Sequence, residues 1–363
     1  MKKIIIILPS FEGGGTENVM INIANSLNNE EFDISIVVMK NSGKFKRRLN
    51  NKIRVISLSS KRARQSIFKI AKVLKEEKPD IVFSSMAPLN IAVSFASLIT
   101  NSKAKLIFRE SNTPSMDRVR YQGVFKYLFS FLYKFMYYKS YRIVAQCEEM
   151  KEDIESFLNI TGKKSKITHI YNPINIENIQ ERMLQESDIN VDTYNFVTVG
   201  RLTFQKGHDL LLNAFSKVAK NNNCHLYIIG EGELKSELED DIKRREIEDQ
   251  VTLLGFQDNP YKYIYSSDTF ILSSRWEGFP NVLLESLVCG TPIISFSCKS
   301  GPKEILSNKS IGTLIEPENF EEMAKEMQLS INKKRTGKID YSEYYMRYSL
   351  ENIVHQYEKL FEF

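Results

Sequence analysis

Two carboxylates, Glu277 and Glu285, have the most informative spacing in this chain of 363 residues. Pro280 and Asn281 favour a helix start between them, so Glu277 would lie in a loop and Glu285 about one turn inside the helix. Amides at a helix start lack intrahelical partners and can bind an anion, while a carboxylate can accept hydrogen bonds from vicinal hydroxyls. A nucleotide sugar would satisfy both requirements. The alternative is a loop glutamate followed by a solvated helix glutamate.

A second charged segment follows the alternating apolar run from Tyr194 to Val199, which predicts a strand. Arg201 offers a planar fork and Lys206 a compact point charge, and both kinds of cation complement a diphosphate. Both residues would follow the carboxyl end of the strand, where open α/β sheets bind ligands. Either cation alone would more commonly be a solvated surface charge.

The elements that must position these residues form two series of strands. Apolar runs alternate with helix-length segments, which predicts parallel, doubly wound α/β sheets. The first series lies at residues 4–8, 34–39, 53–58, 81–83, 106–108 and 143–145. The second lies at residues 196–199, 226–229, 251–254, 269–272, 293–296 and 312–315. We therefore expect one Rossmann-like domain over residues 1–173, a linker over 174–193 and a second Rossmann-like domain over 194–341.

Gly13, Gly14 and Gly15 follow the first predicted strand and precede a helix that Thr16 could cap. Glycines at such a turn let the backbone approach a bound group closely. The spacing is neither G-x-G-x-x-G nor a Walker motif, so by itself it indicates a tight strand-to-helix turn.

Together these segments resemble the retaining glycosyltransferases of family 4, which have the GT-B fold of two Rossmann-like domains whose parallel sheets face a central cleft. The resemblance spans most of the chain. It rests on the E-x7-E pattern of Glu277 and Glu285, the run Gly200–Gly207 and the glycine turn. It implies that a C-terminal helix, at about 342–363, crosses back onto an acceptor-binding first domain, and that the second domain binds the donor.

The resemblance also implies roles for individual residues. Arg201 and Lys206 would bind the donor diphosphate, Glu277 would contact hydroxyls of the donor sugar, and Glu285 would hold the ribose. Arg201, Lys206 and Glu277 would carry the chemistry. Further donor contacts would come from Gly14, Gly15, Gly255, Phe256, Gly278, Phe279, Asn281 and Val282.

We expect no metal and no cofactor, because the nucleotide sugar is a substrate and the sequence has no Asp-x-Asp motif of the kind that commonly holds a cation in sugar transferases. The cations and the helix terminus would then neutralise the diphosphate. Where many family members carry a histidine, after the fifth strand, this chain has Arg109 and Glu110, followed by Asn112. These residues could orient the acceptor, or the first two could form an ion pair that closes the loop. In the family, the departing phosphate oxygen takes the acceptor's proton.

Charge is distributed unequally along the chain. Residues 1–170 contain 29 Lys and Arg against 15 Asp and Glu, a balance of +14, whereas the remainder has 21 against 30, or −9. This predicts an anionic partner for the first half, and the absence of a recognisable nucleic-acid-binding motif favours membrane lipid. The aromatic stretch from Arg118 to Arg142 would be either a helix buried in a core or an interfacial helix at a membrane.

No apolar run approaches the ~18 residues needed to span a membrane, and the four cysteines are typical of a cytosolic protein. We therefore expect a cytoplasmic, membrane-peripheral and metal-independent retaining hexosyl- or N-acetylhexosaminyl-transferase. It would move a sugar from a nucleotide-diphosphate sugar, with a UDP-sugar favoured, to a glycan or lipid-linked glycan in surface polysaccharide or glycoconjugate synthesis. Two alternatives stay open, an inactive partner subunit of the same fold and a nucleotide-sugar epimerase.

Overall fold

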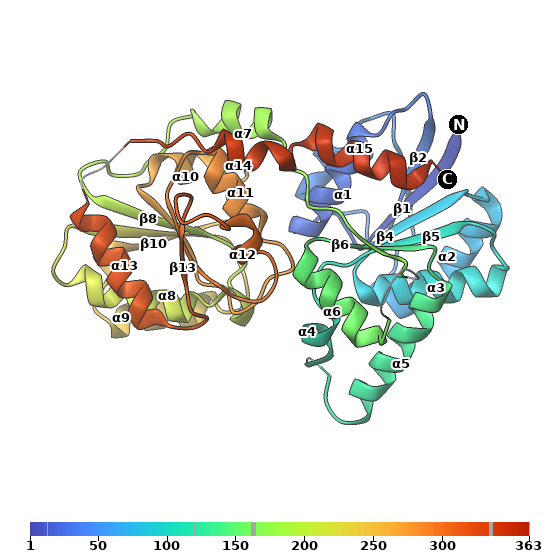
Figure 1. Cartoon of the computed structure of the whole chain (residues 1–363), viewed down its shortest axis with the longest axis horizontal. Helices are drawn as coiled ribbons and strands as arrows, with labels where there is room; N and C mark the ends of the chain where they lie inside the picture. The colour runs from blue at the N-terminus through green and yellow to red at the C-terminus, as the bar shows by residue number, and fades with distance from the viewer. Residues whose placement is uncertain (13, 120, 161–164, 334–336, 363) are drawn as a thin grey trace. The chain divides into compact units, whose positions relative to one another are not determined.

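The computed structural model describes residues 1–12, 14–119, 121–160, 165–333 and 337–362. The chain divides into two compact units, each a parallel sheet with helices on both faces (Figure 1). Unit 1 comprises Met1–Pro173 and Tyr348–Phe363, and unit 2 comprises Ile174–Arg347. Among the described residues, no helix is both long enough and apolar enough to cross a membrane.

The sheet of unit 1 has seven parallel strands in the order β3-β2-β1-β4-β5-β6-β7. They are β1 (Lys2–Leu8), β2 (Phe32–Val38), β3 (Arg54–Ser57), β4 (Ile81–Ser85), β5 (Lys105–Arg109), β6 (Arg142–Ala145) and β7 (Ile167–His169). β1 lies between β2 and β4, with Ile4 opposite both Ile34 and Ile81. Every side chain from Ile4 to Leu8 is fully buried, as expected for a central strand covered on both faces.

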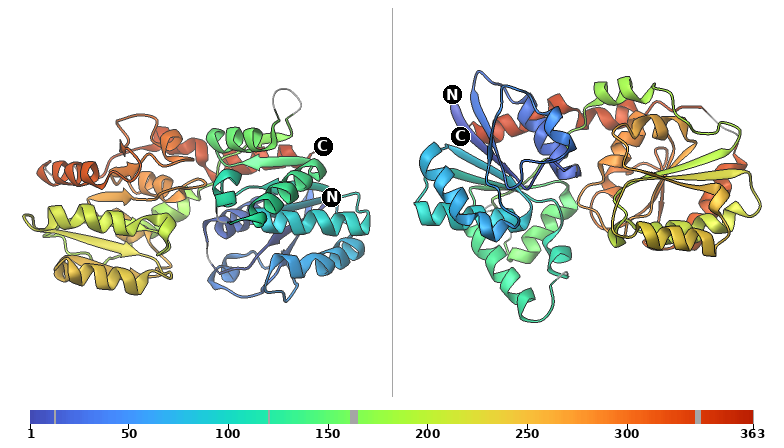
Figure 2. Two further views of the ribbon diagram at one scale, coloured as in Figure 1. Left: turned by 90° about the horizontal axis from the view of Figure 1, so that it is seen from below. Right: turned by 180° about the vertical axis from the view of Figure 1, so that it is seen from behind.

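Helices cover both faces of this sheet, as the views in Figures 1 and 2 show. α1 (Gly15–Ser26) contacts α15 (Leu350–Phe361) on one face. On the other face α2 (Ala63–Glu77) contacts α3 (Ala87–Thr100), which in turn contacts α5 (Val124–Lys139). The remaining elements are η1 (Lys44–Arg48), α4 (Pro114–Val119) and α6 (Glu148–Leu158).

The C-terminal helix belongs to the core of unit 1. The rings of Tyr357 and Phe361 lie 5.4 and 5.5 Å from that of Phe83 in β4. The predicted single helix at about 342–363 is nevertheless wrong, because α14 (Ser342–Tyr345) and the 3-10 turn η4 (Met346–Tyr348) precede α15. Ser349 starts a new helix by accepting a hydrogen bond from the Asn352 amide.

The sheet of unit 2 has six parallel strands in the order β10-β9-β8-β11-β12-β13. They are β8 (Tyr194–Val199), β9 (Cys224–Ile229), β10 (Val251–Gly255), β11 (Thr269–Leu272), β12 (Ile293–Phe296) and β13 (Thr313–Ile315). One face carries α8 (His208–Ala219), α9 (Lys235–Arg244) and α13 (Phe320–Asn332). The other carries α7 (Ile176–Met183), α10 (Tyr261–Ser266), α11 (Asn281–Val288) and α14. Short helical turns complete the unit as η2 (Phe204–Lys206), η3 (Glu248–Gln250) and α12 (Pro302–Ile305).

The stretch 174–193, expected as a linker, instead contains α7 and belongs to unit 2. The Asn175 side chain caps α7 by accepting from the Asn178 amide at 3.0 Å. Ile179 is buried, and Arg182 donates to the Asp258 carboxylate at 3.0 Å. Because Ile179 is the one buried side chain of α7, its sequence has almost no apolar periodicity. This explains why the helix was not predicted.

Strand order reverses once in each sheet, between β1 and β4 in unit 1 and between β8 and β11 in unit 2. Connections on either side of such a point leave in opposite directions, which opens a crevice at the carboxyl ends of the strands. Arg201 and Lys206 follow β8, and Glu277 follows β11.

Candidate active site

The loops that follow β8 and β11 are packed directly against each other. Gly207, in the β8 loop, has φ +63°, and a Cβ atom there would lie 2.1 Å from the carbonyl oxygen of Ser273. Only glycine permits both the dihedral angle and this approach. The Ser273 hydroxyl donates to the Lys206 carbonyl at 3.0 Å, so the two loops are held in register.

This packing brings Lys206 and Glu277 together. Lys206 Nζ lies 2.6 Å from Glu277 Oε1, and the Ser274 hydroxyl donates to the same oxygen at 2.5 Å. The two side chains are only 17% and 6% exposed, so this ion pair is largely shielded from solvent. Within the described residues, hydrogen bonds reach Glu277 through Oε1 alone, which leaves Oε2 to accept from a ligand.

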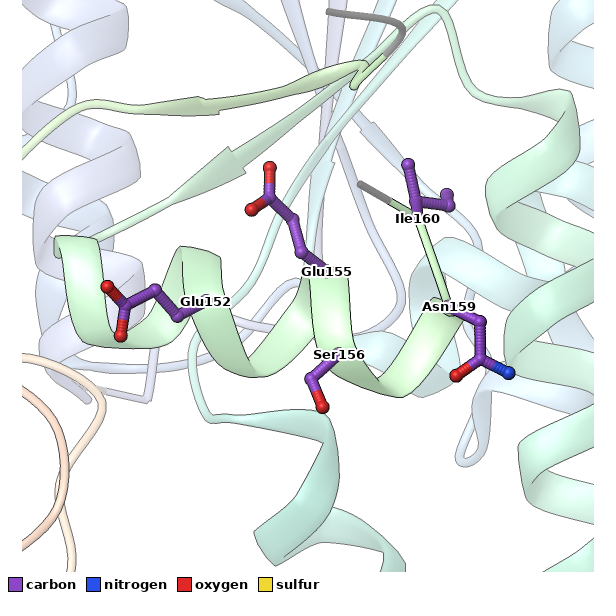
Figure 3. Close-up of a pocket in the computed structure, with 5 residues that line it drawn as sticks. All are labelled: Glu152, Glu155, Ser156, Asn159 and Ile160. Atoms are coloured by element: carbon purple, nitrogen blue, oxygen red, sulfur yellow. The ribbon is translucent and has the colours of Figure 1, made fainter. Parts of the chain in front are cut away.

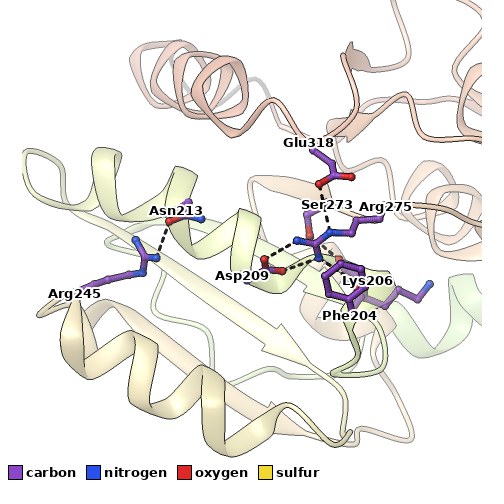
Figure 4. Close-up of polar contacts among 8 residues, drawn as sticks. All are labelled: Phe204, Lys206, Asp209, Asn213, Arg245, Ser273, Arg275 and Glu318. Atoms are coloured by element: carbon purple, nitrogen blue, oxygen red, sulfur yellow. Dashed lines mark hydrogen bonds and ion pairs between the residues drawn. The ribbon is translucent and has the colours of Figure 1, made fainter.

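Arg275 braces the loop that carries Lys206 (Figure 4). Its guanidinium donates two hydrogen bonds to Asp209, at 2.9 and 2.6 Å, and one to the Phe204 carbonyl at 2.8 Å. It also lies over the Phe204 ring, 3.9 Å from the centroid. Burial raises the pKa of Asp209, but the hydrogen bonds from Arg275 outweigh it and lower the pKa overall. Sequence reasoning missed this brace, although Asp209 and Arg275 lie three and two residues from the predicted Lys206 and Glu277.

Helix α11 begins at Asn281, one position after Pro280, as the predicted helix start requires. The preceding residues Gly278, Phe279 and Pro280 are buried, and the Ser300 hydroxyl donates to the Gly278 carbonyl at 2.8 Å. Glu285 is half-buried on this helix, and Val282 in its first turn is also half-buried. Both glutamates of the E-x7-E pattern therefore belong to one loop-helix junction of unit 2.

The remaining predicted donor residues of unit 2 lie at the same edge of its sheet. The Leu202 amide donates to the Glu231 carbonyl at 2.9 Å, and the Gly230 amide donates to the Gly255 carbonyl at 2.8 Å. These bonds align the loops after β8, β9 and β10. Arg201 is exposed beside them, and its guanidinium has no hydrogen-bond or ion-pair partner in the described part of the chain. Phe256 is half-buried at the end of β10.

The glycine turn lies in unit 1, and Gly13 falls outside the described residues. α1 begins at Gly15, where a Cβ atom would meet open space. A Cβ atom on Gly14 would lie 2.5 Å from Glu17 Oε2, so the nearest group to Gly14 is a carboxylate of the same helix. A donor contact of Gly14 and Gly15 stays a prediction.

Arg109 and Glu110 are fully buried at the end of β5. Arg109 donates to Asn172 Oδ1 and, at 3.4 Å, to the Ser85 hydroxyl. Glu110 Oε1 accepts from Asn90 at 2.9 Å. Over the described residues, the ion pairs do not include one between Arg109 and Glu110, and each residue instead bonds to neutral side chains. Arg109 Nε and Glu110 Oε2 are buried without a hydrogen-bond partner among the described residues.

Burial raises the pKa of Glu110 to about 8, against the lowering effect of hydrogen bonds from Tyr137 and Asn90. Of the three residues predicted to meet an acceptor, only Asn112 is partly exposed, and it donates to Asp117 at 3.3 Å. The acceptor role of Arg109, Glu110 and Asn112 stays a prediction.

A hollow of unit 1, about 510 Å³, lies at α6, and two of its five lining residues are glutamates (Figure 3). Its lining residues are Glu152, Glu155, Ser156, Asn159 and Ile160. Glu155 accepts from the Ser165 hydroxyl at 2.8 Å. Nowhere in the described ranges do three His, Cys, Asp or Glu side chains come together in a way that could hold a metal ion.

Comparison with known proteins identifies the family. Residues 13–178 match the model of Glycosyltransferase Family 4, and residues 179–345 match that of Glycosyl transferases group 1. The chain is also 31% identical to N-acetylgalactosamine-N,N'-diacetylbacillosaminyl-diphospho-undecaprenol 4-alpha-N-acetylgalactosaminyltransferase of Campylobacter jejuni, over 89% of this chain and 88% of that protein. The chain therefore belongs to the family 4 glycosyltransferases, which confirms the predicted family.

Two further similarities agree with this result. The chain is 34% identical to an uncharacterized glycosyltransferase of Methanocaldococcus jannaschii, over 66% of this chain but only 61% of that protein. The structure superimposes with a TM-score of 0.81 on Anabaena HepE in complex with UDP and glucose, over 100% of both chains at 19% identity. This likeness confirms the predicted GT-B fold of two Rossmann-like domains.

Proposed function

We propose that this glycosyltransferase transfers a hexosyl or N-acetylhexosaminyl group from a UDP-sugar to a lipid-linked glycan, with retention of anomeric configuration. The contact that carries the proposal is the 2.6 Å pair of Lys206 and Glu277 where β8 and β11 end. It joins a phosphate-binding cation to a carboxylate that can hold sugar hydroxyls, at the strand-order reversal where open sheets bind ligands.

In this proposal Lys206 and Arg201 neutralise the negative charge that builds on the leaving diphosphate. A preorganised cation in a site of low solvent access stabilises such charge more than it would in water. Arg275 keeps Lys206 in place, because its guanidinium bonds to the Phe204 carbonyl and to Asp209 and lies over the Phe204 ring. Because these cations would neutralise the leaving diphosphate, the proposed reaction requires no metal ion.

In this proposal Glu277 Oε2 and Glu285 bind different parts of the donor. Glu277 Oε2 would accept from hydroxyls of the transferred sugar, and Glu285, inside α11, would accept from the ribose hydroxyls. The backbone from Gly278 to Val282 would contact the sugar and phosphates, with support from Gly255 and Phe256.

The lipid-linked acceptor is supported by the names of similar proteins. Besides the Campylobacter jejuni protein, an Escherichia coli protein 26% identical over 83% of this chain is named UDP-Gal:alpha-D-GlcNAc-diphosphoundecaprenol alpha-1,3-galactosyltransferase. Both names specify an acceptor carried on diphospho-undecaprenol. The second also specifies a UDP-sugar donor.

A membrane-bound acceptor agrees with the surface of α5. Large apolar side chains on one side of this helix and at its start are strongly exposed, including Val124 at 74%, Tyr127 at 71%, Phe131 at 66% and Tyr138 at 76%. The opposite side, with Phe129, Tyr133, Met136 and Tyr137, is buried. The core-helix alternative therefore holds for one side of α5, and the interfacial alternative stays a prediction for its exposed side.

We propose that this aromatic face lies in the boundary layer of a membrane on the cytoplasmic side. An exposed apolar stripe on an amphipathic helix is typical of interfacial binding. Helical geometry places Lys134 and Lys139 on the two borders of the stripe, where they can reach anionic headgroups.

The function is tested by incubating the full chain with a panel of UDP-sugars and a diphosphoundecaprenol-linked glycan in the presence of EDTA. We expect a new lipid-linked product from one donor, with the anomeric configuration of the donor by NMR. Inversion would contradict the retaining mechanism, and activity only after magnesium is restored would contradict the metal-free site. Epimerisation of the donor without transfer would favour the epimerase alternative.

A further inference from the structure

The loop that follows β12, residues 297–301, packs against the loop that carries Glu277. β12 pairs in parallel with β11, so both loops leave the same edge of the sheet of unit 2. Trp276 and Lys299 form a parallel bridge, and the Glu277 amide donates to the Lys299 carbonyl at 3.2 Å. The neighbouring loop therefore holds the backbone of Glu277, whereas Lys206 holds its carboxylate.

Ser300, in the loop after β12, has a backbone conformation that residues other than glycine rarely adopt. Its φ is +75°, and its side chain is fully buried. Such a conformation persists only where the surrounding structure determines it. Here the Ser300 hydroxyl donates to the Gly278 carbonyl at 2.8 Å. A side chain of the β12 loop thus reaches the residue that directly follows Glu277.

Gly301 explains how the two loops can lie so close together. It has φ +101°, and a Cβ atom there would lie 2.6 Å from Pro280 Cδ and 3.2 Å from Phe279 Cα. Only glycine permits both the dihedral angle and this approach. α12 begins directly after it, and the amides of Glu304 and Ile305 each donate to the Gly301 carbonyl at 3.0 Å. The contact between the two loops is therefore held firmly.

The hydrogen bond from Ser300 sets the orientation of one peptide unit. The peptide bond between Gly278 and Phe279 is trans, so its carbonyl and its amide point in opposite directions. Because the carbonyl is directed at the Ser300 hydroxyl, the Phe279 amide is directed away from the β12 loop. The backbone on both sides of the Glu277 Cα is then fixed, by the bond from its own amide and by the bond to the next carbonyl.

We propose that Ser300 is a positioning residue for the donor sugar, because its hydroxyl fixes the backbone from which the Glu277 carboxylate reaches the sugar hydroxyls. The inference rests on the proposed function and adds to it a residue that contacts no substrate. A small displacement of a contacting group is enough to slow a reaction strongly. Ser300 would act on the sugar end of the donor, since the cations proposed to bind the diphosphate, Arg201 and Lys206, extend from the β8 loop.

Two substitutions of the full chain separate positioning from backbone strain. Ser300→Ala removes the hydroxyl and keeps a side chain at the unfavourable φ, whereas Ser300→Gly removes the hydroxyl and relieves the strain. The matched control is Ser267→Ala, which removes a buried hydroxyl that donates to the Tyr263 carbonyl, also at 2.8 Å. Ser267 precedes β11, so it lies at the edge of the sheet opposite the proposed donor site.

The variants are compared in steady-state transfer assays with the UDP-sugar that the wild type uses, and in calorimetry with UDP. We expect kcat to fall ~10-fold in both Ser300 variants and to stay unchanged in the control, as expected for the loss of one hydrogen bond. UDP affinity and binding stoichiometry should be equal in all four proteins. The ratio of kcat/KM for the preferred donor over the next best donor should fall several-fold, because a displaced Glu277 discriminates less between sugars.

The donor ratio and the UDP titration separate this role from a structural one. A smaller fraction of folded enzyme would lower kcat and the UDP stoichiometry together and leave the donor ratio unchanged, and that result would overturn the proposal. So would wild-type kcat in Ser300→Gly, because Ser300 would then have no role beyond its conformation. Loss of UDP affinity in parallel with kcat would also overturn it, since Ser300 would then support the whole site. Failure of the proposed function would show separately, as absence of transfer by the wild type.

Discussion

Lys206 and Glu277 of unit 2, and Arg109 and Glu110 of unit 1, each combine a basic and an acidic residue at the carboxyl ends of parallel strands. The first pair remains 17% and 6% exposed and is joined by a 2.6 Å contact. The second pair is 0% exposed, and each member bonds to neutral side chains instead. The same residue types at the same edge of a sheet are thus used differently in the two units.

Position relative to the strand-order reversal explains the difference. β8 and β11 flank the reversal in unit 2, so the loops that follow them line a crevice. β5 lies one strand away from the reversal in unit 1. There Asn90 of α3 donates a hydrogen bond to Glu110, and the buried Tyr357 of α15 lies close enough to influence the pKa of Arg109. An ionisable side chain at a strand end can therefore contact a ligand at the strand-order reversal. Where helices cover the strand end, as at β5, the side chain bonds within the unit instead.

The largest effect should follow from removing Lys206. Lys206→Ala should reduce kcat by ~10²–10³-fold, as the loss of a preorganised charge-stabilising donor does in other enzymes. The matched control is Lys217→Ala, whose ion pair with Glu321 lies on the surface of the same unit at 46% and 57% exposure. Steady-state transfer assays measure both, and equal activity of the two variants would show that Lys206 is not part of the chemistry.

Glu110 should make the stability of unit 1 depend on pH. Its carboxyl keeps its proton up to about pH 8 in the folded protein, whereas the ordinary value is 4.5. The folded state therefore binds more protons between these values, and stability should fall as pH rises from about 5 to 8, by up to ~1.4 kcal/mol per pH unit.

Glu110→Gln keeps the hydrogen bond from Asn90 to a carbonyl oxygen but cannot ionise. Urea unfolding from pH 5 to pH 8 should therefore show a flatter profile for this variant than for the wild type, with higher stability at pH 8. The exposed Glu321→Gln serves as the control. Parallel profiles of wild type and Glu110→Gln would mean that the buried carboxyl does not titrate in this range.

A smaller effect should distinguish the two glutamates of the donor site. Glu285→Ala should weaken affinity for free UDP roughly 10-fold, the loss expected for a hydrogen bond to a charged group. Glu277→Ala should leave UDP affinity largely intact and reduce transfer, because its contact exists only when the sugar is present. Calorimetry with UDP and transfer assays test the pair, and the reverse pattern would exchange the two roles.

The smallest effect should come from the aromatic face of α5. Replacement of Phe131 and Tyr138 by Ser should weaken sedimentation with anionic vesicles several-fold, since each buried apolar side chain contributes about 1.5–3 kcal/mol less the cost of partial insertion. UDP affinity should not change. A matched control, Phe68→Ser, alters an exposed aromatic residue on α2. Equal vesicle binding by all of these proteins would show that the aromatic face of α5 does not bind the membrane.

Much of the fold could be predicted from the sequence, because buried parallel strands are nearly continuous apolar runs. Five consecutive apolar residues from Ile4 to Leu8 predict β1, and all five are buried. The segments that meet in the proposed donor site could also be predicted, since Lys206 and Glu277 lie in recognisable motifs. Their contact joins residues 71 apart in sequence and depends on Gly207, which no local pattern reveals.

The sequence was weaker where long-range contacts decide the outcome. The burial of Glu110 depends on Asn90, 20 residues away, and on Tyr137. The brace of Arg275 on Asp209 spans 66 residues. Strand β7 was not predicted, because Ile167 is its one buried residue and Thr168 and His169 are polar.

The central claim is that the carboxyl edge of β8 and β11 is the donor site, and calorimetric titration with UDP tests it most directly. The proteins are the wild type, the double variant R201A/K206A and the surface control Lys217→Ala. The account predicts that wild type and control bind UDP with equal affinity, and that the double variant loses at least ~100-fold, because two charge-assisted contacts to the diphosphate are removed. Undiminished UDP binding by a folded double variant would contradict it.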